Sequence, residues 1–202
     1  MPSLLEQDGT FDGIVSRDFL VASTTQNYGT SGTVVFQGEG KAFNHVSALV
    51  HLTILDSDDL VDATLTGISI EGGNIVAPSS YSFETSSVTL SPNSNSDLLS
   101  TTLTQEMDKD QDYYFVLNAK STESNNVKLS IQYTTNGKDY IAESNSFSNN
   151  IFTSGKQHNF TVNIKDKQLS ITEATINPWT DSENTENIII NNPQEFENEE
   201  SE

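Results

Sequence analysis

Residues 43–55, FNHVSALVHLTIL, constrain the fold more than any other stretch, because no other combines such length, apolar content and regularity. Every second residue from Val46 to Ile54 is apolar, which is the period that a β-strand imposes, while the opposite face is mixed. The β-branched residues and the acidic turn at 56–59 favour a strand over a helix. We therefore predict that 43–55 forms the central strand of a sheet.

Other short segments alternate with the same period and are separated by turn signals. The expected strands lie at 19–22, 34–36, 65–70, 81–83, 88–90, 113–117, 127–133, 140–142, 160–164 and 169–171. Asn136-Gly137 predicts a hairpin, because both residues tolerate the positive φ of a type I′ turn, and residues 166–167 mark a second hairpin. Residues 91–112 are rich in Ser, Asn and Asp, so we expect a long loop there, anchored by Leu98, Leu99 and Leu103.

Many short strands without an amphipathic helix predict an all-β fold, an antiparallel β-sandwich of Greek-key or transthyretin-like topology. We expect an N-terminal arm with short edge strands (1–40), the sandwich (41–181) and an acidic, disordered tail (182–202). The residues after Trp179 include eight acids and no base, so the tail cannot bury enough apolar area to order itself, although the isoleucines at 188–190 could add to a sheet edge. Trp179, the only tryptophan, is expected to be largely buried against the strand at 43–55 or at 160–164.

Charge and composition exclude several classes of function. The formal net charge is −20 and Arg17 is the only arginine, so a nucleic-acid partner is excluded. Without cysteine there is no disulfide, thiolate metal site or cysteine nucleophile. We expect a soluble chain that carries no export signal, because no run approaches the roughly 18 to 20 apolar residues of a membrane helix and the first ten residues lack a signal pattern.

The sequence predicts no metal site, and the candidates closest to one are three aspartates at alternate positions. Asp108, Asp110 and Asp112 are spaced like the first ligands of a calcium loop. Tyr113 and Ala119 stand where such a loop has its glycine and its glutamate, so the three aspartates are kept only as candidate calcium ligands.

Histidines and tyrosines are expected to have packing roles. His45 and His51 lie on one strand face but about 20 Å apart at about 3.3 Å per residue, too far to share a metal ion, and His158 is expected to pack as well. The five strand tyrosines are expected to be core or cross-strand partners, with a flat platform for sugars or host proteins as the alternative; they are Tyr81, Tyr113, Tyr114, Tyr133 and Tyr140. No nucleophile elbow or phosphate loop occurs, so we expect no enzyme, no catalytic residue and no cofactor.

Residues 43–50, FNHVSALV, resemble the Phe-x-His-x-Leu/Ser-x-Val opening of the second half of fimbrillin-like proteins, the pilus subunits and surface lipoproteins of Bacteroides-type bacteria. Five further segments are similar to family motifs and follow in the family's order: 18–22, 68–73, 131–140, 154–158 and 176–179. The resemblance covers residues 18–181. The signal peptide, lipobox cysteine and N-terminal half of the family have no counterpart in this sequence, so we expect it to be a C-terminal portion, a trimmed chain or the product of a shortened gene model.

The resemblance implies a non-enzymatic structural or adhesion protein of the cell surface, outer membrane or fimbria, a pilus subunit or accessory component that joins other fimbrial subunits by strand exchange. The alternative is a surface β-sandwich module that binds a glycan or host ligand. The resemblance also implies that subunits exchange strands after proteolysis behind an arginine, which makes Arg17 the processing candidate. Because the N-terminal half is missing and Arg17 is expected to be a solvated charge, we expect a monomer in isolation and no polymerising species after cleavage there.

Overall fold

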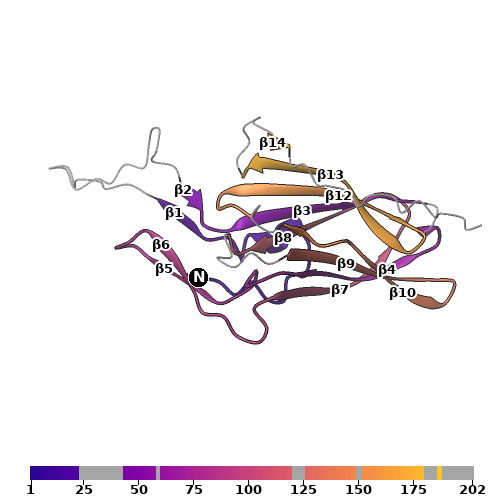
Figure 1. Cartoon of the computed structure of the whole chain (residues 1–202), viewed down its shortest axis with the longest axis horizontal. Helices are drawn as coiled ribbons and strands as arrows, with labels where there is room; N and C mark the ends of the chain where they lie inside the picture. Colours follow the sequence, from indigo (N-terminus) through magenta and orange to yellow (C-terminus); the bar gives the residue numbers. More distant parts are fainter. Residues whose placement is uncertain (23–42, 58–59, 120–125, 149–151, 180–185, 188–202) are drawn as a thin grey trace, which may run out of the picture.

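Two five-stranded β-sheets lie face to face in the computed structural model of the chain, which describes residues 1–22, 43–57, 60–119, 126–148, 152–179 and 186–187 (Figure 1). The elements are α1 (Phe11–Ile14), β1 (Leu20–Ala22), β2 (Phe43–His45), β3 (Ala48–Ile54), β4 (Thr64–Glu71), β5 (Ser79–Ser82), β6 (Ser87–Leu90), β7 (Leu98–Glu106), β8 (Gln111–Leu117), β9 (Asn126–Thr135), β10 (Lys138–Glu143), β11 (Phe147–Ser148), β12 (Lys156–Lys165), β13 (Gln168–Pro178) and β14 (Glu186–Asn187). The expectation of an all-β fold is confirmed for this part of the chain.

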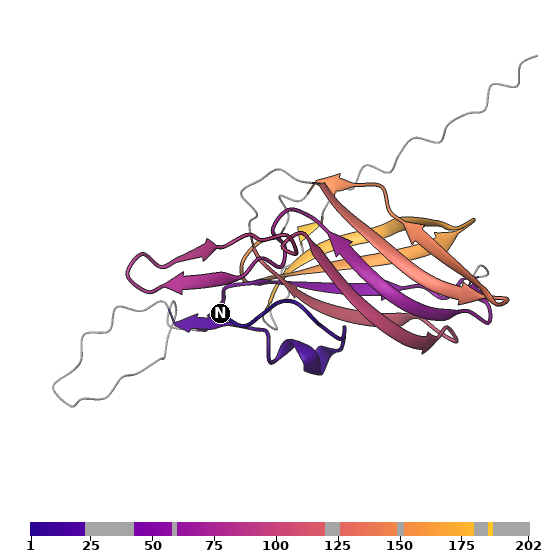
Figure 2. The same ribbon diagram turned by 90° about the horizontal axis from the view of Figure 1, so that it is seen from below.

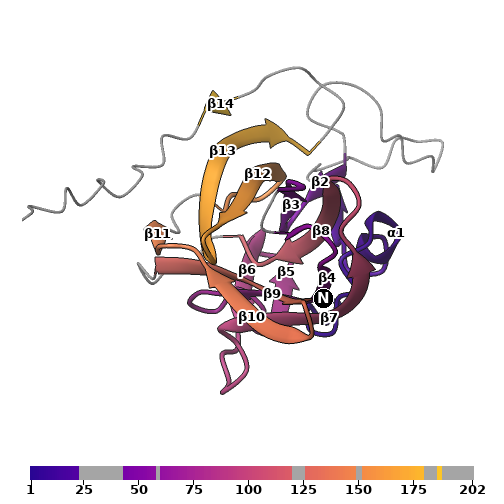
Figure 3. The same ribbon diagram turned by 90° about the vertical axis from the view of Figure 1, so that its right-hand side faces the viewer.

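One sheet has the order β10–β9–β4–β7, with β11 also paired to β9, and the other has the order β14–β13–β12–β3–β8. The two sheets face each other (Figure 3). Buried side chains of both sheets form one hydrophobic core. The expectation that all strands pair antiparallel is wrong, because β12 runs parallel to β3. The chain between these two strands passes through the opposite sheet, so no hairpin turn forces them to run in opposite directions.

The run at 43–55 divides into two strands rather than one, with a break at Ser47. The N–H of Gly155 donates to Ser47 O at 3.0 Å, and Ser154 Oγ donates to His45 O at 2.8 Å. Because these bonds occupy the carbonyl groups where the strand bends, β2 turns away and pairs with β1, while β3 continues between β12 and β8. Within β3 the predicted apolar face is buried, so this strand has the central position that the sequence indicates.

Both predicted hairpins are present, because their turn residues adopt the backbone angles that a two-residue turn needs. Asn136 and Gly137 have φ of 52° and 69° between β9 and β10. Asp166 and Lys167 have φ of 52° and 66° between β12 and β13. These positive angles match the twist of the paired strands, which fixes the register of each hairpin.

The prediction of a long loop over 91–112 is wrong, because most of this segment belongs to β7 and the start of β8. Strand β7 pairs with β4 along nearly its whole length. Leu99 and Thr101 point into the core, whereas Leu98 is 49% exposed. The period of two is therefore present, but serine and threonine fill so many of its positions that composition conceals it.

The two-stranded ribbon β1–β2 and the hairpin β5–β6 project from one end of the sheets, side by side (Figure 2). Trp179 lies at the same end, is partly buried, and packs on the core and on His45, which confirms the expected contact with the run at 43–55. The predicted strand at 34–36 lies outside the described residues. So does the predicted tail at 182–202, apart from β14, which pairs with β13.

Candidate functional site

Residues 1–17, here called the N-terminal cap, pack along the outer edge of β8. The side-chain amide of Gln7 donates to Val116 O at 2.8 Å and to Leu4 O at 2.8 Å, and its Oε1 accepts from Val116 N at 2.7 Å. The N–H of Tyr114 donates to Gly9 O at 2.8 Å. In an edge strand every second residue directs its main-chain groups outward, so the cap satisfies groups that would otherwise be open to another strand.

Side chains of the cap also enter the core, which holds the cap in place. Leu4 and Ile14 are buried among core residues, and α1 lies beside β8 (Figure 3). Thr101 Oγ1 of β7 donates to Gln7 O, so the cap joins the edges of both sheets. Gly9 has a φ of +79°, and a Cβ at this position would lie 3.1 Å from the Tyr113 ring, so glycine is required where the cap approaches β8.

Arg17, the processing candidate, closes the cap rather than extending into solvent. Its Nη1 donates to Ser3 O at 2.7 Å and to Leu5 O at 2.6 Å, and its Nη2 donates to Glu6 O at 3.1 Å. Its main-chain N–H bonds to Ile14 O at 2.9 Å, within a tight turn. A protease that recognises arginine needs this side chain free and the backbone extended, and the fold provides neither.

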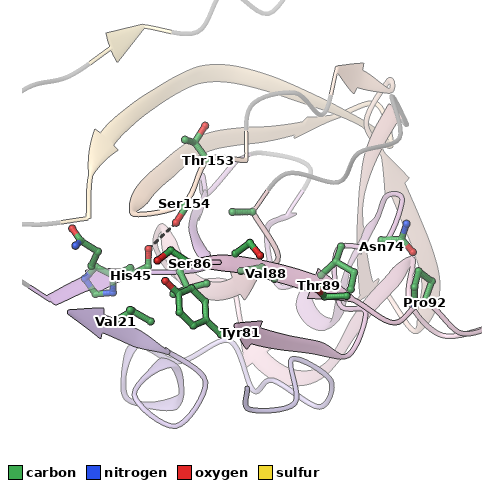
Figure 4. Close-up of a pocket in the computed structure, with 15 residues that line it drawn as sticks. Val21, His45, Asn74, Tyr81, Ser86, Val88, Thr89, Pro92, Thr153 and Ser154 are labelled. Carbon is green, nitrogen blue, oxygen red and sulfur yellow. Dashed lines mark hydrogen bonds between the residues drawn. The ribbon is translucent and has the colours of Figure 1, made fainter. Parts of the chain in front are cut away.

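A groove of about 870 Å³ lies between the ribbon β1–β2 and the hairpin β5–β6 (Figure 4). Val21, Tyr81 and Val88 supply much of its apolar surface, while Ser87 and Thr89 contribute hydroxyl groups. None of the lining residues that the structure describes is Asp, Glu, Lys or Arg, although the chain as a whole is strongly acidic. An uncharged groove of this kind is suited to a neutral ligand rather than to an ion.

His45 forms one wall of the groove and joins three parts of the chain. Its Nδ1 bonds to Asp18 Oδ2 at 2.9 Å, and its ring stacks on Trp179 with the ring centres 3.9 Å apart. Residues 152–156, here called the junction turn, lie against the same place, because Gly155 O accepts from Trp179 N at 2.8 Å and Ser154 donates to His45 O. The base of the ribbon is therefore held by hydrogen bonds from Asp18 and the junction turn and by stacking on Trp179.

The model of the family described as fimbrillin-like matches residues 13–179, which include the groove and both sheets apart from β14. The chain belongs to the fimbrillin-like family. Family membership supports the expectation of a non-enzymatic fimbrial or adhesion protein. A comparison with curated proteins gives no match.

Solved structures similar to this fimbrillin-like chain come from species of Bacteroides and Porphyromonas. A proposed cell adhesion protein from Bacteroides uniformis is 18% identical, with 68% of this chain and 52% of that chain covered and a TM-score of 0.44. A proposed cell adhesion protein from Bacteroides ovatus is 16% identical over 70% of this chain and 48% of that chain, with a TM-score of 0.46. The tip fimbrial protein Mfa3 from Porphyromonas gingivalis, with a C-terminal truncation, is 12% identical over 68% and 52%, with a TM-score of 0.35. The chain thus spans about half the length of these proteins.

Two of the three calcium candidates of the fimbrillin-like chain have separate hydrogen-bond partners. Asp110 accepts from the N–H of Asp56 at 2.8 Å, and Asp112 accepts from Thr53 at 2.7 Å and bonds to His51 at 2.9 Å. Burial opposes ionisation of Asp112, but the hydrogen bonds from Thr53 and His51 outweigh it and lower its pKa. In the part of the chain that the structure describes, no three acidic or histidine side chains are grouped to hold a metal, Asp108 included.

The remaining histidines and the tyrosines have packing partners within the described residues. His51 stacks on Tyr114 with ring centres 4.5 Å apart, and Tyr133 stacks on Tyr140 across β9 and β10 at 5.4 Å. Tyr113 is buried, which raises its pKa to about 12. These contacts use the tyrosines as cross-strand and core partners, and among the five strand tyrosines Tyr81 is the one that lines the groove.

Among the buried polar side chains, Gln7 escaped sequence reasoning, whereas His158 was expected to pack and is buried. Gln7 carried no signal, because a single glutamine in a polar N-terminal stretch indicates no partner. His158 did carry one, since it lies in phase with Phe160, Val162 and Ile164 and so shares their inward face. The helix that the sequence did not predict, α1, has only four residues, and no described helix is long and apolar enough to cross a membrane.

Proposed function

We propose that this fimbrillin-like chain is a non-enzymatic structural module of the cell surface, a pilus subunit or accessory component that joins other fimbrial subunits by strand exchange. Family membership supports the fimbrial and surface assignment. The two facing sheets support a Greek-key or transthyretin-like sandwich. An outer-membrane location and the division into arm (1–40), sandwich (41–181) and tail (182–202) belong to the same proposal.

One observation carries the strand-exchange proposal: the cap seals the edge of β8 without forming a strand. Within the described residues, a glutamine side chain imitates a neighbouring main chain at Val116, and one further bond joins Tyr114 to Gly9. A real strand would pair with every second residue of the seven-residue β8 and would also place side chains over the sheets. An incoming strand could therefore replace the cap with a net gain of main-chain hydrogen bonds.

The test compares the intact chain with a variant that lacks residues 1–9, using sedimentation velocity. We expect the intact chain to be monomeric, because the β8 edge is occupied and the net charge opposes association. The shortened chain should form oligomers, and a synthetic peptide of residues 1–17 added in trans should return it to monomer. Oligomers that ignore the peptide would indicate non-specific aggregation, and a folded variant that stays monomeric would refute the proposal.

The second candidate function is a binding module for a neutral glycan or host ligand, and the uncharged groove beside Tyr81 favours it. Tyr81 and Thr89 together offer the apolar surface and hydroxyl group that a sugar ring would contact. The test is retention of the monomer on a glycan array, with Tyr81→Ala as the variant and Tyr140→Ala, which lies away from the groove, as the matched control. Retention lost only in Tyr81→Ala would support the binding module; equal retention of both variants would refute it.

A further inference from the structure

His158 is fully buried, and its ring is held in one protonation form. The exposed fraction of its side chain is 0%, and Nε2 accepts a hydrogen bond from Thr153 N at 3.2 Å. Because Nε2 is the acceptor, the neutral ring carries its proton on Nδ1, which is buried and has no hydrogen-bond partner among the described residues. Phe152 packs edge-on against the ring, with the ring centres 5.3 Å apart.

The junction turn connects this buried ring to the groove. Its Thr153 N–H bonds to His158, while the next two residues bond to the ribbon base and to Trp179. Thr153 and Ser154 themselves line the groove (Figure 4). A change in the protonation of the His158 ring therefore acts on the groove wall through Thr153 and Ser154.

The surroundings of the ring oppose a positive charge. Its strand neighbours are apolar, Val50 on β3 and Ile176 on β13, and the charged side chain that acts on it is Lys156 of the junction turn. Burial lowers the pKa of His158 to about 4, a backbone contact of Thr153 opposes this shift in part, and Lys156 adds to it. Across the turn, Asp18 and His45 bind each other rather than His158.

The other buried titratable groups are tyrosines. Tyr113 and Tyr133 are the remaining ionisable side chains among the buried residues that the structure describes, and neither is an acid that could compensate an imidazolium in the physiological pH range. A protonated ring would therefore remain uncompensated in the closed structure.

We propose that His158 is a proton-sensitive latch of the junction turn. When Nε2 takes up a proton it can no longer accept the Thr153 N–H, so the turn opens and releases the groove wall and Trp179. The opening is a property of the fold itself, so it is expected whichever ligand the groove binds.

Linkage sets the size and the pH range of the effect. In the open turn the ring titrates near its ordinary value of about 6.5, whereas in the closed turn its pKa is about 4. Protons thus bind the open form more tightly, and closure is strongest above pH 6.5 and is lost as the pH falls. The open fraction should rise about tenfold per pH unit between these values, about 300-fold in all, and level off below pH 4.

The test is hydrogen exchange of the Thr153 and Gly155 amides in the intact chain between pH 7 and pH 4, corrected for the intrinsic rates. We expect their protection to fall about 300-fold over this range and to be insensitive to low urea, the sign of a local opening. Ile131, paired on both sides within the other sheet, serves as the reference amide. If the turn amides are as protected as Ile131 and share its urea dependence, the turn does not open locally and the proposal fails.

Two variants distinguish the effect of His158 from that of His45. In His158→Gln, an uncharged side chain that can still accept a hydrogen bond, the pH dependence of the turn amides should disappear. Trp179 fluorescence is a second readout, but His45 lies against that ring and could itself change the emission on protonation. The fluorescence change should therefore persist in His45→Gln and vanish in His158→Gln; the reverse result would assign the titration to His45 and overturn the latch.

Discussion

Replacing Gln7 with leucine should destabilise the chain strongly, although the change is nearly isosteric. Three hydrogen bonds of 2.7–2.8 Å are lost, with Val116 N, Val116 O and Leu4 O. At about 0.5–1.5 kcal/mol each, these bonds account for about 3 kcal/mol. Val116 is 0% exposed, so its unpaired main-chain groups add to the cost, and the greater apolar burial of leucine offsets part of it.

Urea denaturation of Gln7→Leu should thus show a free energy of unfolding lowered by about 3 kcal/mol, with the urea dependence unchanged. Gln168→Leu is the matched control, because Gln168 is exposed at the start of β13, and its effect should stay within about 0.5 kcal/mol. A loss below about 1 kcal/mol in Gln7→Leu would refute the reasoning, because the glutamine amide would then not be supporting the β8 edge.

Three further predictions follow from the junction and the cap. Trp179→Ala should cost about 2–3 kcal/mol in urea denaturation, less than the 3–5 kcal/mol of a fully buried aromatic, because Trp179 is only partly buried; a loss above 4 kcal/mol would contradict this. Arginine-specific protease should leave the folded chain uncut at Arg17 and produce no oligomer, whereas rapid cutting would show that its three carbonyl contacts are not maintained. Between pH 6.5 and pH 4 the free energy of unfolding should fall by about 3 kcal/mol more in the wild type than in His158→Gln, because the pKa of His158 is about 4 in the folded state and lies below its unfolded value. An equal pH dependence of the two free energies would contradict this.

Local signals predicted the parts of the fold that short segments determine. The Asn136-Gly137 turn and the apolar alternation of β3 could be read directly, because turn angles and strand period depend on neighbouring residues. The parallel pairing of β3 with β12 could not, because it depends on where the chain returns after passing through the other sheet. β7 was missed because Thr101 occupies a core position that composition assigns to a loop.

The candidate site was less predictable, since it depends on contacts between distant residues. Gln7 and Val116 are 109 residues apart, and no local pattern indicates that an amide side chain will pair with a strand edge. Arg17 could be singled out as the only arginine, but its three carbonyl partners arise from the backbone path of residues 3–6. The family resemblance indicated a class of function, whereas the sealed β8 edge and the groove could be recognised only in the folded structure.

Hydrogen exchange at the Val116 amide of the intact chain tests most directly whether the N-terminal cap seals the β8 edge. The bond from Val116 N to Gln7 Oε1 predicts that this edge amide is protected, and that Gln7→Leu reduces its protection by roughly a hundredfold, the equivalent of about 3 kcal/mol. The amide of Ile131, in the other sheet, gives the global reference. If Val116 in the intact chain exchanges as fast as an unpaired edge amide, the cap does not occupy the edge and the strand-exchange account is wrong.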